Sequence, residues 1–238
     1  MNKNLLLLSI AQGLFLTNNV TFIAINGLVG LSLAPVPWMA TLPVMGYVVG
    51  GALSTGLVAK SQQRFGRKGS FLLGLLVALL SAGIGAWAVL HSSFLLLVVA
   101  TVVAGYYSAN GQLYRFAAAE LCAPDYREKA VSLVMAGGLM GAIIGPNLAM
   151  HTKNWLEFPF AGAYVALAGI AVLSMVVMSY IEFPPVVAKK ASDHTGRPLR
   201  EIMRQPVFFI ATLSAALGYG VMNLLMAATP LAMQVCGL

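Results

Sequence analysis

Hydrophobic residues fill five long runs of this chain that contain no Asp, Glu, Lys or Arg. A membrane-spanning helix needs about 20 apolar residues to cross the hydrocarbon layer, so each of the two longest runs has room for two helices. Turns are expected at Pro35 and Pro37 in "LAPVPW" and at His91–Ser93. The pattern predicts seven spans: 5–31, 38–59, 70–90, 94–118, 131–151, 158–181 and 207–231.

The composition is typical of a membrane protein and not of a soluble domain. Only 9% of the 238 residues are charged, whereas soluble globular domains have about 25%. We therefore expect an all-α polytopic membrane bundle. The first span is too long for a cleavable signal peptide and lacks a small-residue cleavage site. Cys122 and Cys236 make no disulfide framework and no Cys/His cluster has metal-ligand spacing, so no metal and no cofactor are expected.

The net charge of +7 is explained by the side of the membrane on which the cations fall. With the N-terminus in the cytoplasm, thirteen Lys and Arg lie inside and Lys153 lies outside, a strong positive-inside bias. These cations hold loops in the cytosol, so nucleic acid is not an expected partner. The thirteen are Lys3, Lys60, Arg64, Arg67, Lys68, Arg115, Arg127, Lys129, Lys189, Lys190, Arg197, Arg200 and Arg204.

We expect three parts along the chain. Residues 1–181 form a six-span bundle, residues 182–206 form a cytoplasmic linker, and residues 207–238 carry a seventh span that begins a second bundle. A lone seventh span has no visible partner, so we interpret the end at Leu238 as a truncation.

Part of the linker has the pattern of a short amphipathic helix. Leu199, Ile202 and Met203 share one helical face, and Arg200 and Arg204 lie opposite. Such a pattern is typical of a helix that lies on the membrane surface.

Small residues recur at every fourth position on two of the predicted spans. Small residues at this spacing let helix backbones approach closely in lipid, so we interpret them as packing positions. They are Gly46, Gly50 and Ser54 on the second span, and Gly137, Gly141 and Gly145 on the fifth.

The stretch "RFGRK" between the second and third spans resembles the loop signature of the major facilitator superfamily. Gly66 permits a tight turn between two antiparallel helices. The chain departs from the fuller signature at Ala59, where the family has Gly, and at Gln63, where it has Asp. The matching residues are Arg64, Phe65, Gly66, Arg67 and Lys68.

The fifth span supplies a second match. "GGLMGAIIGP" resembles the G-x-x-x-G-P pattern on the fifth helix of the superfamily's proton-coupled exporters, with Gly141, Gly145 and Pro146 in the matching positions. Pro146 is expected to bend the helix. The family usually continues with two more glycines, and residues 148–150 here are Leu, Ala and Met.

The resemblance covers essentially the whole chain, with weaker matches in "LCAPDYREKAVSL", "RPLREIMRQP" and "YGVMNLLMAATPLAM". It implies a permease of the bacterial inner membrane with twelve spans or more, of which this chain holds the first seven. Such proteins move small solutes by alternating access between two bundles. The helix-5 match favours efflux in exchange for protons. The fourth span departs from the family where Thr101 replaces an Arg.

Polar residues within spans predict a transport path, because polar groups in hydrocarbon usually face a bundle interior or a wet cavity. Gln12, Asn19 and Asn26 share one face of the first span, and a second stripe on the fourth span ends at Arg115. Hydrogen bonding between helices is the alternative role for the amides. For Arg115 the alternatives are pairing with Glu120 or reaching to the membrane surface. The candidates are Gln12, Asn19, Asn26, Thr101, Gln112 and Arg115.

Other function classes fit less well. A seven-span receptor or light-driven pump needs a lysine or paired charges within the spans, and an intramembrane enzyme needs a catalytic cluster there. The seven acidic residues all lie at span ends or in loops, so a titrating group for proton coupling is not found in mid-membrane. A non-transporting fragment of a permease remains the main alternative to a transporter.

Overall fold

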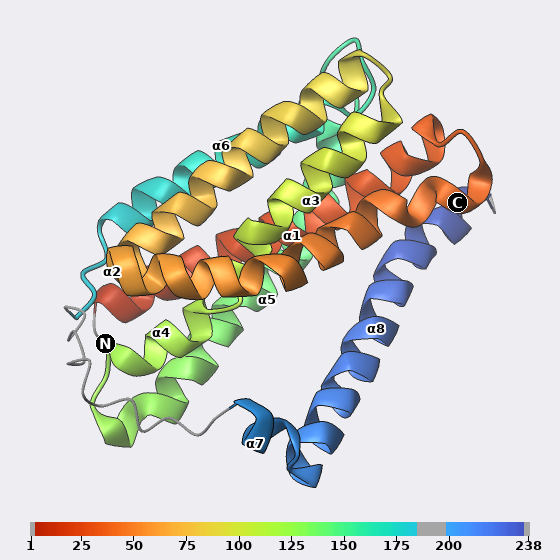
Figure 1. The fold of residues 1–238 in the computed structure, drawn as a ribbon. Coiled ribbons are helices and arrows are strands. Elements are labelled where there is room, and N and C mark those ends of the chain that lie inside the picture. Colours follow the sequence, from red (N-terminus) through yellow and green to blue (C-terminus); the bar gives the residue numbers. More distant parts are fainter. Residues whose placement is uncertain (1–2, 185–198, 236–238) are drawn as a thin grey trace. The chain divides into compact units, whose positions relative to one another are not determined.

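The structure is a computed structural model that describes residues 3–184 and 199–235 (Figure 1). The chain forms two compact units, Met1–Pro185 and Val186–Leu238. The regular structure in the described ranges is helical, which confirms the predicted all-α class. The predicted cations Lys189, Lys190 and Arg197 lie outside the described residues.

The first unit holds six α-helices and two short 3-10 helices. They are α1 (Lys3–Leu33), η1 (Pro37–Thr41), α2 (Leu42–Leu90), α3 (Phe94–Gly111), α4 (Tyr114–Glu120), η2 (Pro124–Tyr126), α5 (Arg127–Thr152) and α6 (Ala161–Ser179). The second unit holds α7 (Leu199–Met203) and α8 (Pro206–Val235). The short helix expected in the linker is therefore present as α7, and its place on the membrane surface stays a prediction.

Six stretches of the described chain are long and apolar enough to cross a membrane. One of them, Pro37–Leu90, has 54 residues, more than twice the length that a crossing requires. Within its α-helical part, α2 (Leu42–Leu90), the residue with a non-helical backbone is Gly66, with φ 71° and ψ −180°. Figure 1 shows the two arms of α2, residues 42–65 and 67–90, running back from the same end. The six stretches overlap the seven predicted spans, because Pro37–Leu90 contains two of them.

The polar segment at 60–69 is not the loop that hydropathy predicted. It is helical on both sides of Gly66, whose dihedral angles are accessible essentially to glycine alone. Because a single residue makes the reversal, the flanking residues stay helical, and Gln, Lys and Arg are good helix formers.

The span predicted at 94–118 agrees with one helical stretch, Phe94–Glu120, in which Gln112 and Leu113 form a turn between α3 and α4. Two other predicted boundaries are corrected. The second span begins with the 3-10 helix η1 in place of an α-helix. The sixth begins at Ala161 and not at residue 158, because Phe160 has a left-handed backbone (φ 68°) and its N–H donates to the Lys153 carbonyl oxygen at 2.7 Å.

The glycines of α5 lie directly against α1. A Cβ atom at Gly141 would overlap the Gly13 carbonyl oxygen and lie 2.6 Å from the Thr17 backbone nitrogen. At Gly145 it would lie 2.9 Å from the Val20 Cβ. The Thr21 hydroxyl also donates to the Gly145 carbonyl oxygen at 2.9 Å. These contacts agree with the packing role predicted for the stripe.

A second close approach joins the first arm of α2 to α3. Cβ atoms built on Gly50 and Gly105 would both overlap backbone atoms of the facing helix. A Cβ at Gly46 would lie 2.8 Å from the Thr101 hydroxyl oxygen. The small-residue stripe of the second span therefore also lies at a helix interface.

Aromatic rings fill the core near the end of the bundle that holds the α2 reversal. Phe15 of α1 packs edge-on against Tyr107 and Tyr114, and Phe71 packs edge-on against Tyr114 and Phe183. Edge-to-face pairs add favourable quadrupole contacts to the buried area. This cluster ties the start of α1 to α2, α3 and α4.

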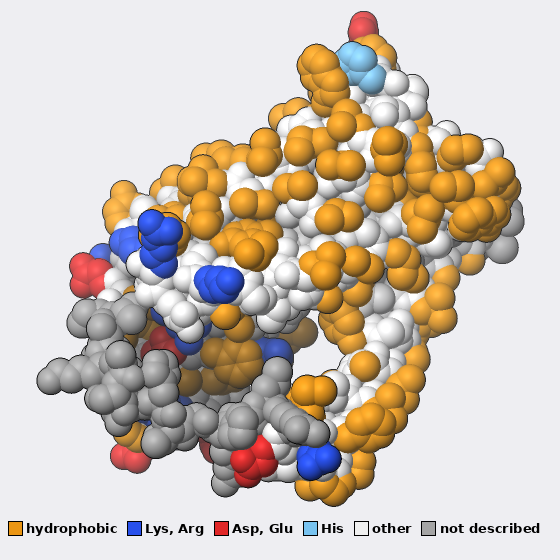
Figure 2. All heavy atoms as spheres, in the orientation of Figure 1, with side chains coloured by type: hydrophobic (Ala, Val, Ile, Leu, Met, Phe, Trp, Pro, Cys, Tyr) orange, Lys and Arg blue, Asp and Glu red, His pale blue; other side chains and the backbone are white. Residues whose placement is uncertain are grey.

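The outer surface of the bundle is apolar between two polar ends. On the face drawn in Figure 2, hydrophobic side chains cover most of the surface, while Lys and Arg of the first unit gather at one end. At the other end Trp38, Trp87 and Trp155 are exposed, and tryptophan is enriched at membrane–water interfaces. The exposed apolar belt is therefore the lipid-facing surface.

We predict that Gly141→Ala destabilises the bundle by about 1–3 kcal/mol, because an added Cβ overpacks the α1–α5 interface. The measurement is thermal or denaturant unfolding of the purified chain in detergent. The control is Gly169→Ala on α6, where no atom lies within 4 Å of the added Cβ. Equal stability of both variants and the parent would contradict this interface.

Candidate functional site

The predicted polar stripe of α1 lies inside the bundle. Gln12, Asn19 and Asn26 are buried, whereas Leu6 and Ile10 are exposed. The Asn26 amide nitrogen donates to the Phe22 carbonyl oxygen at 2.8 Å, and its amide oxygen accepts from the Tyr164 hydroxyl at 2.8 Å. Asn26 thus makes a hydrogen bond between helices α1 and α6, the alternative role considered for the amides.

Gln12 and Asn19 differ from Asn26 in their hydrogen bonding. The amide oxygens of both residues are buried and have no partner among the residues that the structure describes. They lie seven residues apart on one face of α1, a rise of about 10 Å. A buried acceptor without a donor is costly. The amide oxygens of Gln12 and Asn19 are therefore path candidates that could accept a hydrogen bond.

The stripe predicted on the fourth span is only partly realised. Thr101 is buried against Gly46 of α2 and donates to the Val98 carbonyl oxygen at 2.8 Å. Gln112 and Leu113, between α3 and α4, keep right-handed dihedral angles, and the Gln112 N–H still donates to the Ser108 carbonyl oxygen at 3.2 Å. Arg115 is exposed, and its guanidinium carbon lies 5.0 Å from the centre of the Phe116 ring.

A small void inside the bundle was not predicted from the sequence. It measures about 10 Å³ and is bordered by Asn18, Tyr47, Ser81 and Tyr107 among others. The Tyr107 hydroxyl is buried without a partner in the described part of the chain, whereas the Asn18 amide donates to the Leu167 carbonyl oxygen at 3.0 Å. The void is about the size of one water molecule, too small for a solute. An adjacent asparagine pair within an apolar run was the available signal.

The "RFGRK" residues anchor the α2 reversal to two neighbouring helix ends. Arg67 forms a two-point ion pair with Glu120, with Nη2–Oε1 at 2.5 Å and Nε–Oε2 at 3.0 Å. Arg67 also donates to the Gln62 side-chain oxygen. The Lys68 ammonium donates to the Ser179 carbonyl oxygen at the end of α6, at 2.6 Å, where cations complement the helix dipole. Glu120 is thus paired with Arg67. The prediction that Arg115 pairs with Glu120 is therefore wrong.

No group of three His, Cys, Asp or Glu residues within residues 3–184 and 199–235 is placed to hold a metal ion. The polar features of the site are therefore neutral amides inside the bundle and charged side chains at one of its ends.

A family model described as Major Facilitator Superfamily matches residues 5–238. The chain belongs to the major facilitator superfamily. This confirms the resemblance drawn from "RFGRK" and "GGLMGAIIGP". The superfamily consists of membrane transporters and not of enzymes.

Three curated relatives agree with this assignment. The riboflavin transporter RfnT of Brucella anthropi is 36% identical over 233 residues, which is 97% of this chain and 58% of the relative. Two uncharacterised MFS-type transporters of Bacillus subtilis also match. YddS is 29% identical over 57% of this chain and 33% of its own length, and YdeG is 28% identical over 74% and 42%. This major facilitator chain therefore spans less than two thirds of the length of these relatives.

Beside its ionic contacts, this superfamily hairpin contains a buried hydroxyl network. The Ser61 and Ser70 oxygens lie 2.6 Å apart across the two arms of α2. Ser70 donates to the Asn110 side-chain oxygen of α3 at 2.8 Å, and the Tyr106 hydroxyl donates to Ser61 at 2.9 Å. Sequence reasoning missed this network, because single serines in an apolar run carry no signal for their partners. Gln63, which the resemblance of "RFGRK" to the loop signature aligns with the family's acidic residue, is exposed.

We predict that Gly66→Ala destabilises the chain by about 1–3 kcal/mol, because a side chain is strained at these backbone angles. Unfolding in detergent measures the loss. Gly56→Ala on the first arm of α2 is the matched control, since no atom lies within 4 Å of its added Cβ. A Gly66→Ala protein as stable as Gly56→Ala would show that the reversal does not depend on glycine.

Proposed function

We propose that this chain belongs to a secondary transporter that moves a small solute across a membrane by alternating access. The observation that carries the proposal is the 36% identity to a riboflavin transporter across 97% of this chain. The superfamily match over residues 5–238 supports the same class. Alternating access in such folds takes place around a site between helical bundles.

Riboflavin, or a solute with similar chemistry, is the proposed cargo. Riboflavin is uncharged and carries N–H and hydroxyl donors. The spans of the first unit supply neutral groups that suit such a molecule, because the amide oxygens of Gln12 and Asn19 are buried acceptors without donors in the described chain. They are buried inside the first unit in this conformation, so the proposal requires that the alternating-access motion open them to a solute bearing hydrogen-bond donors.

The proposed path uses the six residues expected from the sequence in different ways. Gln12 and Asn19 are the proposed solute contacts. Arg115 is exposed and, beside the half-buried Gln112, is proposed to donate hydrogen bonds to the solute at the cytoplasmic end; it would attract the solute by charge only if the cargo were anionic. Asn26 and Thr101 make intrabundle hydrogen bonds, and we propose that they shape the path by fixing helix positions.

We further propose export from the cytoplasm in exchange for protons, across the bacterial inner membrane and with the N-terminus inside. The distribution of Lys and Arg supports this orientation. The match of Gly141, Gly145 and Pro146 to the exporters' helix-5 pattern supports the direction. The acidic residues lie at span ends and in loops, so the proton-coupled step would use a group near a membrane surface or outside this chain.

We predict that Asn19→Leu lowers riboflavin flux about tenfold, the factor expected for the loss of one buried hydrogen bond to the solute. Flux is measured by riboflavin fluorescence in liposomes that contain the purified chain. The control is Asn147→Leu on α5, which removes an exposed amide bonded only locally to the Ile143 carbonyl oxygen. Unchanged flux in Asn19→Leu would remove Asn19 from the path. No flux above that of protein-free liposomes for the parent would contradict riboflavin transport by this chain.

A pH gradient tests the coupling. The test uses liposomes in which the cytoplasmic face of the chain points outward. An acidic lumen should accelerate riboflavin entry, because protons that leave the lumen down their gradient drive riboflavin in the opposite direction. A protonophore should abolish the acceleration. Riboflavin movement that ignores the gradient, or that follows protons in the same direction, would exclude proton antiport while leaving transport itself intact.

A further inference from the structure

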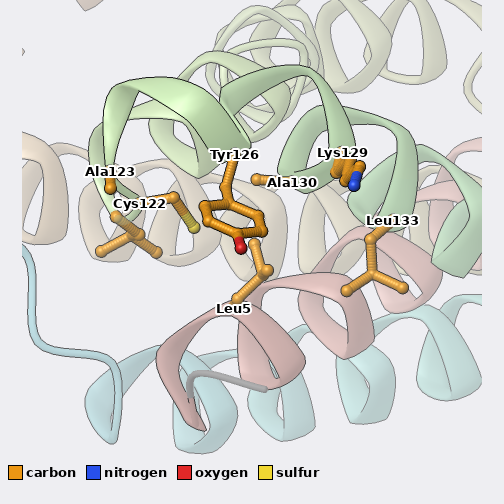
Figure 3. A pocket seen from close by; sticks show the side chains of 8 residues that line it. Leu5, Cys122, Ala123, Tyr126, Lys129, Ala130 and Leu133 are labelled. Atoms are coloured by element: carbon orange, nitrogen blue, oxygen red, sulfur yellow. The ribbon is translucent and has the colours of Figure 1, made fainter.

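A pocket of about 350 Å³ lies between the start of α1, the segment that joins α4 to α5, and the first turns of α5. Its lining includes Leu5, Cys122, Tyr126, Lys129 and Leu133. Figure 3 shows Leu5 of α1 and the ring of Tyr126 facing each other across it, with Cys122 to one side and Lys129 and Leu133 to the other. The volume is at the small end of ligand pockets.

The pocket straddles the predicted membrane boundary. Leu5 belongs to the charge-free run that begins at residue 4, and Leu133 belongs to the run that begins at residue 130. Lys129 is the last charged residue before the second of these runs. One side of the pocket therefore consists of residues predicted to lie within the hydrocarbon layer. The other side consists of residues predicted to lie at the charged membrane surface.

The electrostatics of the lining favour an anionic occupant. Among the eight lining residues, the Lys129 ammonium is the charged group. Its Nζ lies 5.6 Å from the centre of the Tyr126 ring. The eight lining residues include no carboxylate that could neutralise the Lys129 charge. Asp125 and Glu128 are neighbours in sequence but do not line the pocket. The occupant must combine an anionic group with an apolar portion.

We propose that this pocket binds an anionic phospholipid of the leaflet at the Lys- and Arg-rich end of the bundle. Lys129 contacts the phosphate, and Leu5 and Leu133 contact the upper part of an acyl chain. Basic pockets between membrane helices at the cytoplasmic side suit anionic head groups. The eight lining residues do not include Gln12, Asn19 or any other residue of the proposed solute path, so loss of lipid binding and loss of transport can be told apart.

Cys122 allows a direct test because it is a free thiol in the pocket lining. In a Cys236→Ser chain it is the remaining cysteine. The rate of its alkylation by a maleimide is compared in nanodiscs of phosphatidylcholine alone and of phosphatidylcholine mixed with phosphatidylglycerol. Phosphatidylglycerol should slow alkylation about fivefold, the gain in occupancy expected for one lysine at an anionic surface. Lys129→Gln should abolish this protection.

Two controls separate binding from the general effect of a negative surface on thiol reactivity. In the same Cys236→Ser background, Cys122→Ser with Gln63→Cys places the thiol on the exposed α2 reversal, outside the pocket. Lys60→Gln removes another exposed cation at the same end. Protection confined to Cys122 and retained in Lys60→Gln supports the proposal. The proposal is overturned if phosphatidylglycerol slows the alkylation of both thiols equally. It is also overturned if Cys122 reacts equally slowly in phosphatidylcholine alone, or if the protection persists in Lys129→Gln.

Discussion

Contact between backbones at glycine is the interaction on which this bundle depends. Inside a bilayer no hydrophobic force drives one apolar helix against another, so close van der Waals contact must hold helices together. Gly141 and Gly145 bring α5 against α1, and Gly50 and Gly105 bring α2 against α3. The remaining features of the first unit, including the aromatic cluster and the α2 reversal, are positioned by these two helix pairs.

The spans and the family could be predicted from the sequence, because both leave local signals. Crossing length and charge exclusion give the spans, and the glycine spacing gives the packing faces. Neither the turn at Gln112 and Leu113 nor the helical conformation up to Gly66 could be predicted. The polarity of a residue indicates whether it lies in lipid or near water, and it says little about its backbone conformation. The hydropathy pattern could not show that the polar hairpin was itself helical.

Partner choice was the least predictable part of the site. Glu120 lies five residues from Arg115 but pairs with Arg67, which is 53 residues away. Asn26 and Asn19 lie on the same face of α1. The Tyr164 hydroxyl of α6 donates to the Asn26 amide oxygen, whereas the Asn19 amide oxygen has no partner among the described residues. These differences depend on which distant helix lies opposite each residue. The periodicity of one sequence shows which residues share a helix face. It does not show which residues of other helices contact that face.

The hydroxyl network at the α2 reversal has a consequence for how the bundle is assembled. The Ser61 hydroxyl lies within hydrogen-bond distance of both the Val58 carbonyl oxygen and Ser70, and Ser70 donates to the Asn110 side-chain oxygen of α3. Asn110 follows Ser70 by 40 residues, so this hydrogen bond exists only once α3 is packed against α2. A different rotation of α3 about its own axis would take the Asn110 acceptor away from Ser70. The network therefore couples the rotation of α3 to the two arms of α2.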